Sequence, residues 1–171
     1  MWSNSRGDTI TAHHLYPTVD DVLGNAYHFC KPVAKLRSDR NALLKAAASG
    51  NPKFFFGSDS APHTTQAKHV KQQPAAGVFT QPYATQLVLD AFELAYKGCI
   101  LKEEDDIAAE ILENFLGGFG RSFYRAPDKR KERTVLKKGD EKIVEVVKKE
   151  GEDIEIVPFR RGQKTWSVIW K

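Results

Sequence analysis

Polar residues with the types and spacing needed for hydrolysis follow an apolar run near the middle of the chain. The segment GSDSAPH occupies positions 57–63, so Asp59 stands directly after a strand-length run and His63 follows four residues later. One oxygen of such an aspartate can ligate a metal ion while the other exchanges a proton. Glycine, serine, aspartate and proline are also common in turns, where Asp59 would only hydrogen-bond its own loop. The residues alone leave both interpretations open.

The first third of the chain predicts alternating strands and helices that lead to this motif. Apolar or β-branched segments predict strands at 9–13, 27–31 and 53–57. Thr18 predicts the start of a short helix that ends near Gly24, and Ser38 predicts a capped helix that runs through 43–49. This order predicts a parallel α/β arrangement. Chemistry is then expected on loops at the carboxyl ends of strands, here the polar loop 58–73.

The remainder of the chain predicts two helices and several short strands. Apolar residues recur at helical spacing in 81–97 and 103–116. The glycines of 117–120 follow a helix rather than a strand, so they predict a helix end and a turn instead of a phosphate-binding loop. Short alternating runs predict strands at 142–147, 153–157 and 164–169. These last segments indicate a small β appendage or surface strands.

The composition fits one soluble globular domain and excludes several kinds of partner. The 171 residues are 41% apolar and 28% charged, with a formal charge of +4. The basic run 129–131 is followed at once by Glu132, so no cationic stripe for nucleic acid forms. Cys30 and Cys99 are the only cysteines, and no run approaches the ~20 apolar residues of a membrane helix. Residues 1–8 also lack the apolar part of a signal peptide, so we expect a cytoplasmic protein.

The other histidines have less specific patterns. His13 and His14 are adjacent, and neighbouring residues of a strand point to opposite faces, so both could not ligate one ion from a strand. A structural or supporting role is the preferred interpretation for each. His69, between lysines of a polar loop, is expected to face solvent, and His28 can be a core residue with one satisfied nitrogen.

The motif GSDSAPH resembles the strand-eight signature of dihydroorotases of the single-function bacterial and fungal type. Four other segments resemble that family in the same order: TITAHHL at 9–15 its strand six, HFCKPVAK at 28–35 its strand seven, AAGVF at 75–79 its flexible loop after strand eight, and VPFRRGQKTWSV at 157–168 its last strand segment. The resemblance implies an α/β fold: the C-terminal portion, about three βα units, of a TIM-barrel metal-dependent hydrolase. It divides the chain into three parts, which are an unrelated segment 1–8, a partial barrel 9–127 and a small C-terminal β appendage 128–171.

The resemblance also implies roles for individual residues. Asp59 would be both a zinc ligand and the general base that shuttles the proton. His63 would help to bind the substrate carboxylate, while Ala61 and Ala76 would line the substrate pocket. Lys31 would offer backbone contacts to the pyrimidine ring, in place of the apolar residue expected in bacterial members. The implied reaction is the reversible, zinc-dependent cyclisation of N-carbamoyl-L-aspartate to L-dihydroorotate in pyrimidine biosynthesis, by an enzyme that can be a homodimer.

Most of the family's two-zinc site has no counterpart in this sequence. The H-x-H pair, the carboxylated lysine and two further histidines precede the TITAHHL segment in the family, and this chain contains no H-x-H. We therefore expect a truncated product or fragment that is inactive alone. Two alternatives remain: a non-catalytic dihydroorotase-like module that associates with a partner chain, and another cyclic amidohydrolase such as a hydantoinase. The AAGVF segment favours dihydroorotase over hydantoinase.

Overall fold

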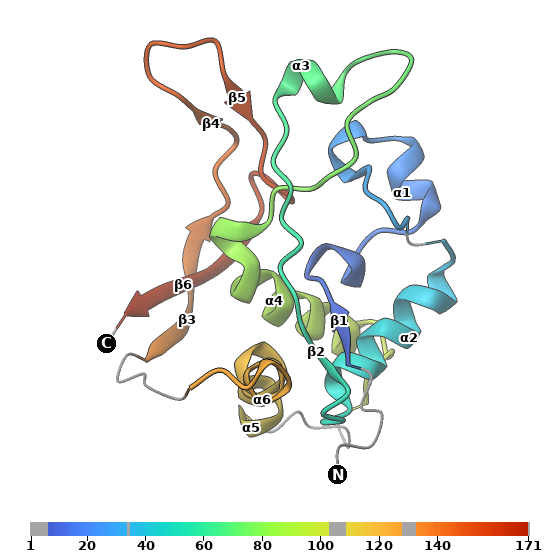
Figure 1. The fold of residues 1–171 in the computed structure, drawn as a ribbon, viewed down its shortest axis with the longest axis vertical. Coiled ribbons are helices and arrows are strands. Elements are labelled where there is room, and N and C mark those ends of the chain that lie inside the picture. Colours follow the sequence, from blue (N-terminus) through green and yellow to red (C-terminus); the bar gives the residue numbers. More distant parts are fainter. Residues whose placement is uncertain (1–6, 34, 103–108, 128–132, 171) are drawn as a thin grey trace.

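A pair of short parallel strands lies at the centre of the fold (Figure 1). The computed structural model describes residues 7–33, 35–102, 109–127 and 133–170. Strand β1 (Asp8–Ile10) pairs with β2 (Phe54–Phe56), and the amide of Gly57 donates to the Ile10 carbonyl at 3.2 Å. A Cβ on Gly57 would lie 2.8 Å from the Cβ of Thr9, so glycine permits this close approach. Because the strands are parallel, the residues that follow β1 and β2 emerge at the same edge.

Two of the three predicted strands of the first part are present among the described residues, and one prediction is wrong. Residues 27–31 do not form a strand: Ala26–His28 form a 3₁₀ turn, η2, and irregular backbone follows. The side chain of Asn25 accepts from the amide of Tyr27 and so starts a turn where the apolar run suggested extended backbone. Strand β1 is also shorter than predicted, because His13–Leu15 form a second 3₁₀ turn, η1.

The helices surround the strand pair, with α1 and α2 on one side of it and the β appendage on the other (Figure 1). Their bounds are Val19–Leu23 for α1, Arg37–Ala48 for α2, Thr65–Lys68 for α3, Ala84–Lys97 for α4, Ala109–Glu113 for α5 and Phe119–Tyr124 for α6. The predicted start of α1 is confirmed, since the amide of Thr18 donates to the Asp21 carboxylate at 2.8 Å. The predicted cap of α2 is wrong: the helix begins one residue before Ser38, and Asp39 accepts from the Leu36 amide.

Helix α4 forms the centre of the core. It follows a 3₁₀ turn, η3 (Gln81–Tyr83), so the helix predicted at 81–97 is confirmed. Its buried residues Leu87, Val88, Ala91, Phe92 and Ala95 belong to one core cluster with residues of β1, α2 and the segment after α5. The polar loop predicted after β2 is interrupted by α3, which is capped by the Thr64 side chain through the amide of Ala67.

The glycine-rich segment after α5 continues the helix rather than ending it. Asn114–Gly118 form a π-helical segment, η5, and α6 follows without a break, so the predicted helix end at 117–120 is wrong. A Cβ on Gly120 would lie 3.2 Å from the Phe55 ring, which indicates that this glycine serves packing against β2. Helix 103–116 is confirmed in its described second half, and residues 103–108 lie outside the described residues.

The β appendage consists of two antiparallel pairs. Strand β3 (Thr134–Lys142) pairs with β6 (Lys164–Trp170), and β4 (Val147–Lys148) pairs with β5 (Glu155–Ile156). The strands predicted at 153–157 and 164–169 are thus found. The strand predicted at 142–147 is wrong, because it lies between β3 and β4, where Ile143 turns inward and is buried. Along the described ranges, the helices are all too short or too polar to cross a membrane.

Candidate functional site

The residues predicted from the motif meet at the carboxyl edge of β1 and β2. A small cavity of about 80 Å³ is lined by His13, Cys30, Lys31, Asp59, Ala61, Ala76, Gly77 and Val78. Four of the five predicted site residues are in this set. The fifth, His63, lies beside it, because its Nε2 donates to the Ala76 carbonyl at 3.1 Å. The structure therefore brings these five residues together, although their separation in sequence reaches 45 positions (31 to 76).

Asp59 stands at a sharp turn that is held against helix α4. Its φ of +39° places it in the left-handed region, which aspartate tolerates better than most residues. The next residue, Ser60, accepts from the amides of Thr80 at 3.1 Å and Gln81 at 3.0 Å, directly before α4. The turn is thereby fixed, and the Asp59 side chain stays exposed at its tip. Sequence reasoning missed Ser60, although its place inside GSDSAPH was a usable signal.

Gly77 lets the loop of residues 75–77 lie directly against the motif. Its φ is +156°, and a Cβ there would come within 2.6 Å of the Ala61 carbonyl oxygen and 2.8 Å of the His63 ring. The amide of Ala61 also donates to the Val78 carbonyl at 3.0 Å. A side chain at Gly77 would therefore push apart the two walls of the cavity.

We expect Gly77→Ala to destabilise the chain by about 2 kcal/mol or more, since strain and a backbone clash combine. Urea unfolding monitored by circular dichroism measures the difference. Gly151→Ala is the matched control, because Gly151 also has a positive φ, of +77°, with nothing within 4 Å of a built Cβ. Equal losses in the two variants would contradict a role for close approach at Gly77.

Lys68 is buried beneath the site and connects two of its segments. Its side chain is 3% exposed, and Nζ donates to the carbonyls of Phe29 at 3.1 Å, Ala75 at 3.0 Å and Gly77 at 2.6 Å. Burial lowers the pKa of Lys68, while the Cys30 thiol opposes that shift. Sequence reasoning missed this residue because a lysine in a polar loop normally faces solvent.

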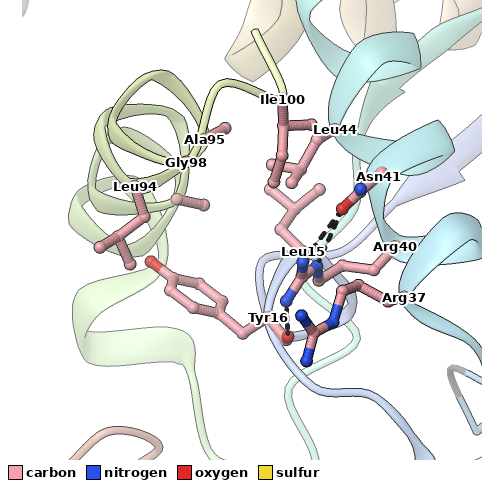
Figure 2. Close-up of a pocket in the computed structure, with 11 residues that line it drawn as sticks. Leu15, Tyr16, Arg37, Arg40, Asn41, Leu44, Leu94, Ala95, Gly98 and Ile100 are labelled. Carbon is pink, nitrogen blue, oxygen red and sulfur yellow. Dashed lines mark hydrogen bonds between the residues drawn. The ribbon is translucent and has the colours of Figure 1, made fainter.

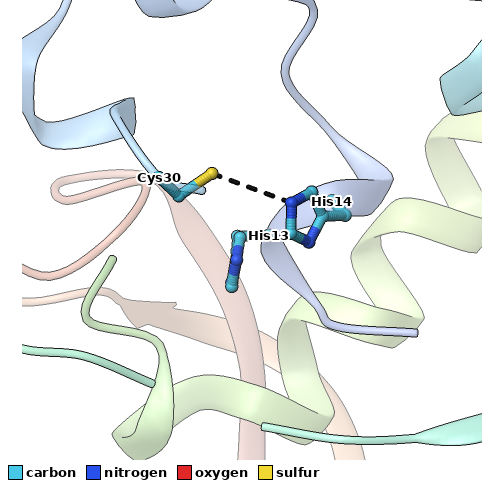
Figure 3. A group of neighbouring side chains, drawn as sticks. All are labelled: His13, His14 and Cys30. Atoms are coloured by element: carbon cyan, nitrogen blue, oxygen red, sulfur yellow. Dashed lines mark hydrogen bonds between the residues drawn. The ribbon is translucent and has the colours of Figure 1, made fainter. Parts of the chain in front are cut away.

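The side chains of His13, His14 and Cys30 lie close together next to the cavity (Figure 3). One ligand atom each from His13, His14 and Cys30 lie within 4.8 Å of one another. Both nitrogens of His14 are occupied, however: Nδ1 pairs with Thr11 Oγ1 and Nε2 donates to the Pro32 carbonyl, each at 2.6 Å. A metal ion would have to displace these hydrogen bonds, so the contacts of His14 support a structural role.

His13 is the unsatisfied member of this group. The expectation that His13 and His14 point to opposite faces is wrong, because they lie in the turn η1 with ring centroids 4.4 Å apart. His13 is 1% exposed, and among the described residues neither ring nitrogen has a hydrogen-bond partner. Burial, and secondarily the charge of His14, lowers the pKa of His13 to about 3. A neutral imidazole thus lines the cavity beside Asp59.

The stability of the fold should fall as the pH is lowered, because of His13. Its folded-state pKa of about 3 lies below the unfolded value of 6.5, so the unfolded chain takes up the proton first. The stabilisation is complete above pH 6.5 and decreases toward pH 3, with a slope of up to about 1.4 kcal/mol per pH unit. Urea unfolding between pH 7 and pH 4 measures this slope. It should flatten in His13→Gln but persist in the exposed control His69→Gln; equal slopes would contradict the assignment.

The other two histidines lie outside the cavity. His28 pairs with Asn25 through Nε2, its Nδ1 has no partner among the described residues, and its ring meets the edge of Phe159, which confirms a packed residue with one satisfied nitrogen. Burial lowers its pKa. His69 is exposed as expected and contacts the Tyr27 hydroxyl at 3.0 Å.

A larger cleft lies between α2 and α4, away from the predicted residues (Figure 2). Its volume is about 340 Å³, and Leu15, Tyr16, Leu44 and Leu94 contribute to its walls. Arg40 also lines this cleft, and its guanidinium donates hydrogen bonds to the side-chain oxygen of Asn41. None of the five predicted site residues lines this cleft, whereas Lys31 and Ala76 help to line a cavity of about 430 Å³ on the loop side of the site.

Comparison with known proteins gives consistent results. No protein-family model matches the chain. The chain is 44% identical over 167 residues to dihydroorotase from Saccharomyces cerevisiae, a match that covers 95% of this chain and 43% of that protein. It is also 44% identical over 165 residues to a probable dihydroorotase from Schizosaccharomyces pombe, covering 95% of this chain and 44% of that protein.

Solved structures agree with these sequence matches. The crystal structure of Saccharomyces cerevisiae dihydroorotase in complex with 5-fluoroorotic acid superposes with a TM-score of 0.84 at 43% identity, covering 96% of this chain and 43% of that one. The dihydroorotase from Campylobacter jejuni superposes with a TM-score of 0.74 at 32% identity, covering 96% of this chain and 44% of that one.

The structure matches part of a TIM-barrel amidohydrolase, the fold class expected from the sequence. More specifically, the chain belongs to the dihydroorotase family, as a relative that spans less than half the length of the members it matches.

Proposed function

We propose that this chain forms the C-terminal part of a dihydroorotase active site. The complete enzyme would cyclise N-carbamoyl-L-aspartate reversibly to L-dihydroorotate in de novo pyrimidine biosynthesis. The convergence of Lys31, Asp59, Ala61 and Ala76 on one cavity carries the proposal. The similarity to the Saccharomyces cerevisiae enzyme, whose solved complex contains 5-fluoroorotic acid, supports a pyrimidine carboxylate as the kind of ligand.

Asp59 would act as the proton shuttle and as one zinc ligand. Its exposed carboxylate at a rigid turn suits both tasks, because one oxygen can bind the metal while the other accepts a proton from the attacking water and returns it to the ring nitrogen. Zinc, when bound, would supply the Lewis acid that polarises the amide carbonyl. The described residues offer one such carboxylate at this edge, so they fit part of a two-zinc site, and further ligands must come from outside the chain's described residues.

The other residues would shape the substrate pocket. His63 donates its Nε2 proton to the Ala76 carbonyl, so its Nδ1 would have to carry a proton as well in order to donate to a substrate carboxylate. The methyl groups of Ala61 and Ala76 leave room for a flat ring, and the backbone at Lys31 would contact that ring's amide groups.

We also propose the division into a partial barrel, 9–127, and an appendage, 128–171, with residues 1–8 separate. The appendage contacts α4 through a hydrogen bond from Thr165 Oγ1 to Asp90 at 3.0 Å, and this contact supports a stabilising role of the appendage toward the barrel part. On the family resemblance, the complete enzyme would work in the cytoplasm on a small-molecule substrate and form a homodimer.

Co-expression tests the function. The full chain would be produced with a polypeptide covering the remaining part of Saccharomyces cerevisiae dihydroorotase, and turnover of dihydroorotate and of hydantoin would be compared. We expect dihydroorotate turnover that depends on both polypeptides, with a preference of about 100-fold or more over hydantoin. Preference for hydantoin would favour another cyclic amidohydrolase, and a stable complex without turnover would favour a non-catalytic module.

A further inference from the structure

The buried side chain of Lys68 connects two separate segments of the site. Lys68 is only 3% exposed, so solvent cannot hydrate its ammonium group. The ammonium instead donates to the carbonyl of Phe29 on one segment and to the carbonyls of Ala75 and Gly77 on the other. The carbonyl of Ala76, between them, accepts from His63. Three consecutive carbonyls of the loop 75–77 are therefore each held by a side chain.

These contacts satisfy Lys68 completely. An ammonium has three donors, and each has an acceptor here, which is the condition under which a charge can remain buried. The acceptors belong to backbone that lines the cavity or lies next to it: Phe29 precedes Cys30 and Lys31, and Ala75 precedes Ala76. A fixed network of this kind sets the distance between the two segments.

We propose that Lys68 is a positioning residue of the substrate pocket, which holds Ala76 and the backbone at Lys31 at the spacing that the substrate requires. The inference rests on the proposed function for the identity of the substrate. A positioning role of Lys68 differs from a general stabilising role in its effect on the kinetics. A loss of folded enzyme lowers the apparent kcat without changing KM. Loss of positioning instead weakens substrate binding and raises KM.

The test uses the co-expressed complex with Lys68→Met, Lys68→Arg and the exposed control Lys71→Met. We expect Lys68→Met to raise KM for dihydroorotate about 10-fold while kcat stays within about threefold, and Lys71→Met to match the native complex. Lys68→Arg keeps the charge but replaces the compact ammonium by a larger group whose donors all lie in one plane, so it should also raise KM. A fall in kcat with unchanged KM in both Lys68 variants would overturn the proposal.

Hydrogen exchange separates this proposal from the proposed function. The amide of Gly77 donates to the Phe29 carbonyl at 2.9 Å, so its exchange reports directly on contact between the two segments. It should exchange about 10-fold faster in the Lys68 variants than in Lys71→Met, whether or not the complex is active. Unchanged exchange would overturn the role of Lys68, whereas a native complex without turnover would count only against the proposed function.

Discussion

Replacing Asp59 by asparagine should reduce dihydroorotate turnover by the co-expressed complex about 10³-fold or more, because an amide cannot accept the proton that the general base must carry. A neutral amide is also a poorer zinc ligand than a carboxylate. The fold should be preserved, since asparagine tolerates the positive φ of +39° at this position at least as well as aspartate. The effect should therefore appear in kcat and not in the amount of folded complex.

Steady-state kinetics at saturating zinc measures this loss, and urea unfolding checks the fold. Asp20→Asn is the matched control, because Asp20 is an exposed carboxylate in α1 that does not line the cavity. Its turnover should equal that of the native complex. Turnover of Asp59→Asn within about threefold of native would contradict the assignment of Asp59 as general base.

The chain alone should bind zinc at least about 100-fold more weakly than the co-expressed complex, and it should turn over no dihydroorotate. A catalytic zinc ion ordinarily has three protein ligands, and Asp59 is the one that the motif provides at this edge. Competition with a coloured chelator measures the affinity for each sample.

Two variants of the chain alone make the zinc experiment decisive. Asp59→Asn should abolish the weak binding if it occurs at the proposed site, whereas Cys30→Ser would abolish it if zinc were held by the group of His13, His14 and Cys30 instead. Zinc-dependent turnover by the 171-residue chain alone, lost in Asp59→Ala, would contradict the expectation that further ligands are required.

The position of the motif could be predicted because it depends on local sequence. The change from the apolar run before Gly57 to the polar residues after it marks the end of a strand, and the structure places Asp59 there. Lys31 and Ala76 could not be predicted from local sequence, because neither residue type indicates a binding site. Only the family resemblance indicated these two residues. Their position at the cavity depends on contacts between segments far apart in the chain.

The errors have physical causes that a sequence pattern does not show. The strand predicted at 9–13 ends at Ile10, because the Thr11 hydroxyl accepts from the His14 amide and supports a turn there. The Asn25 side chain has a similar effect on the strand predicted at 27–31. Lys68 could not be found at all, because its three carbonyl partners come together only in the folded chain.

A crystal structure of the co-expressed complex with zinc, with the ions located by anomalous scattering, would show whether Asp59 is a zinc ligand. We expect a carboxylate oxygen of Asp59 at roughly 2.0–2.2 Å from a zinc ion, next to the cavity that Ala61 and Ala76 line. A complete zinc site with Asp59 more than about 4 Å from every ion, well beyond ligand distance, would contradict it.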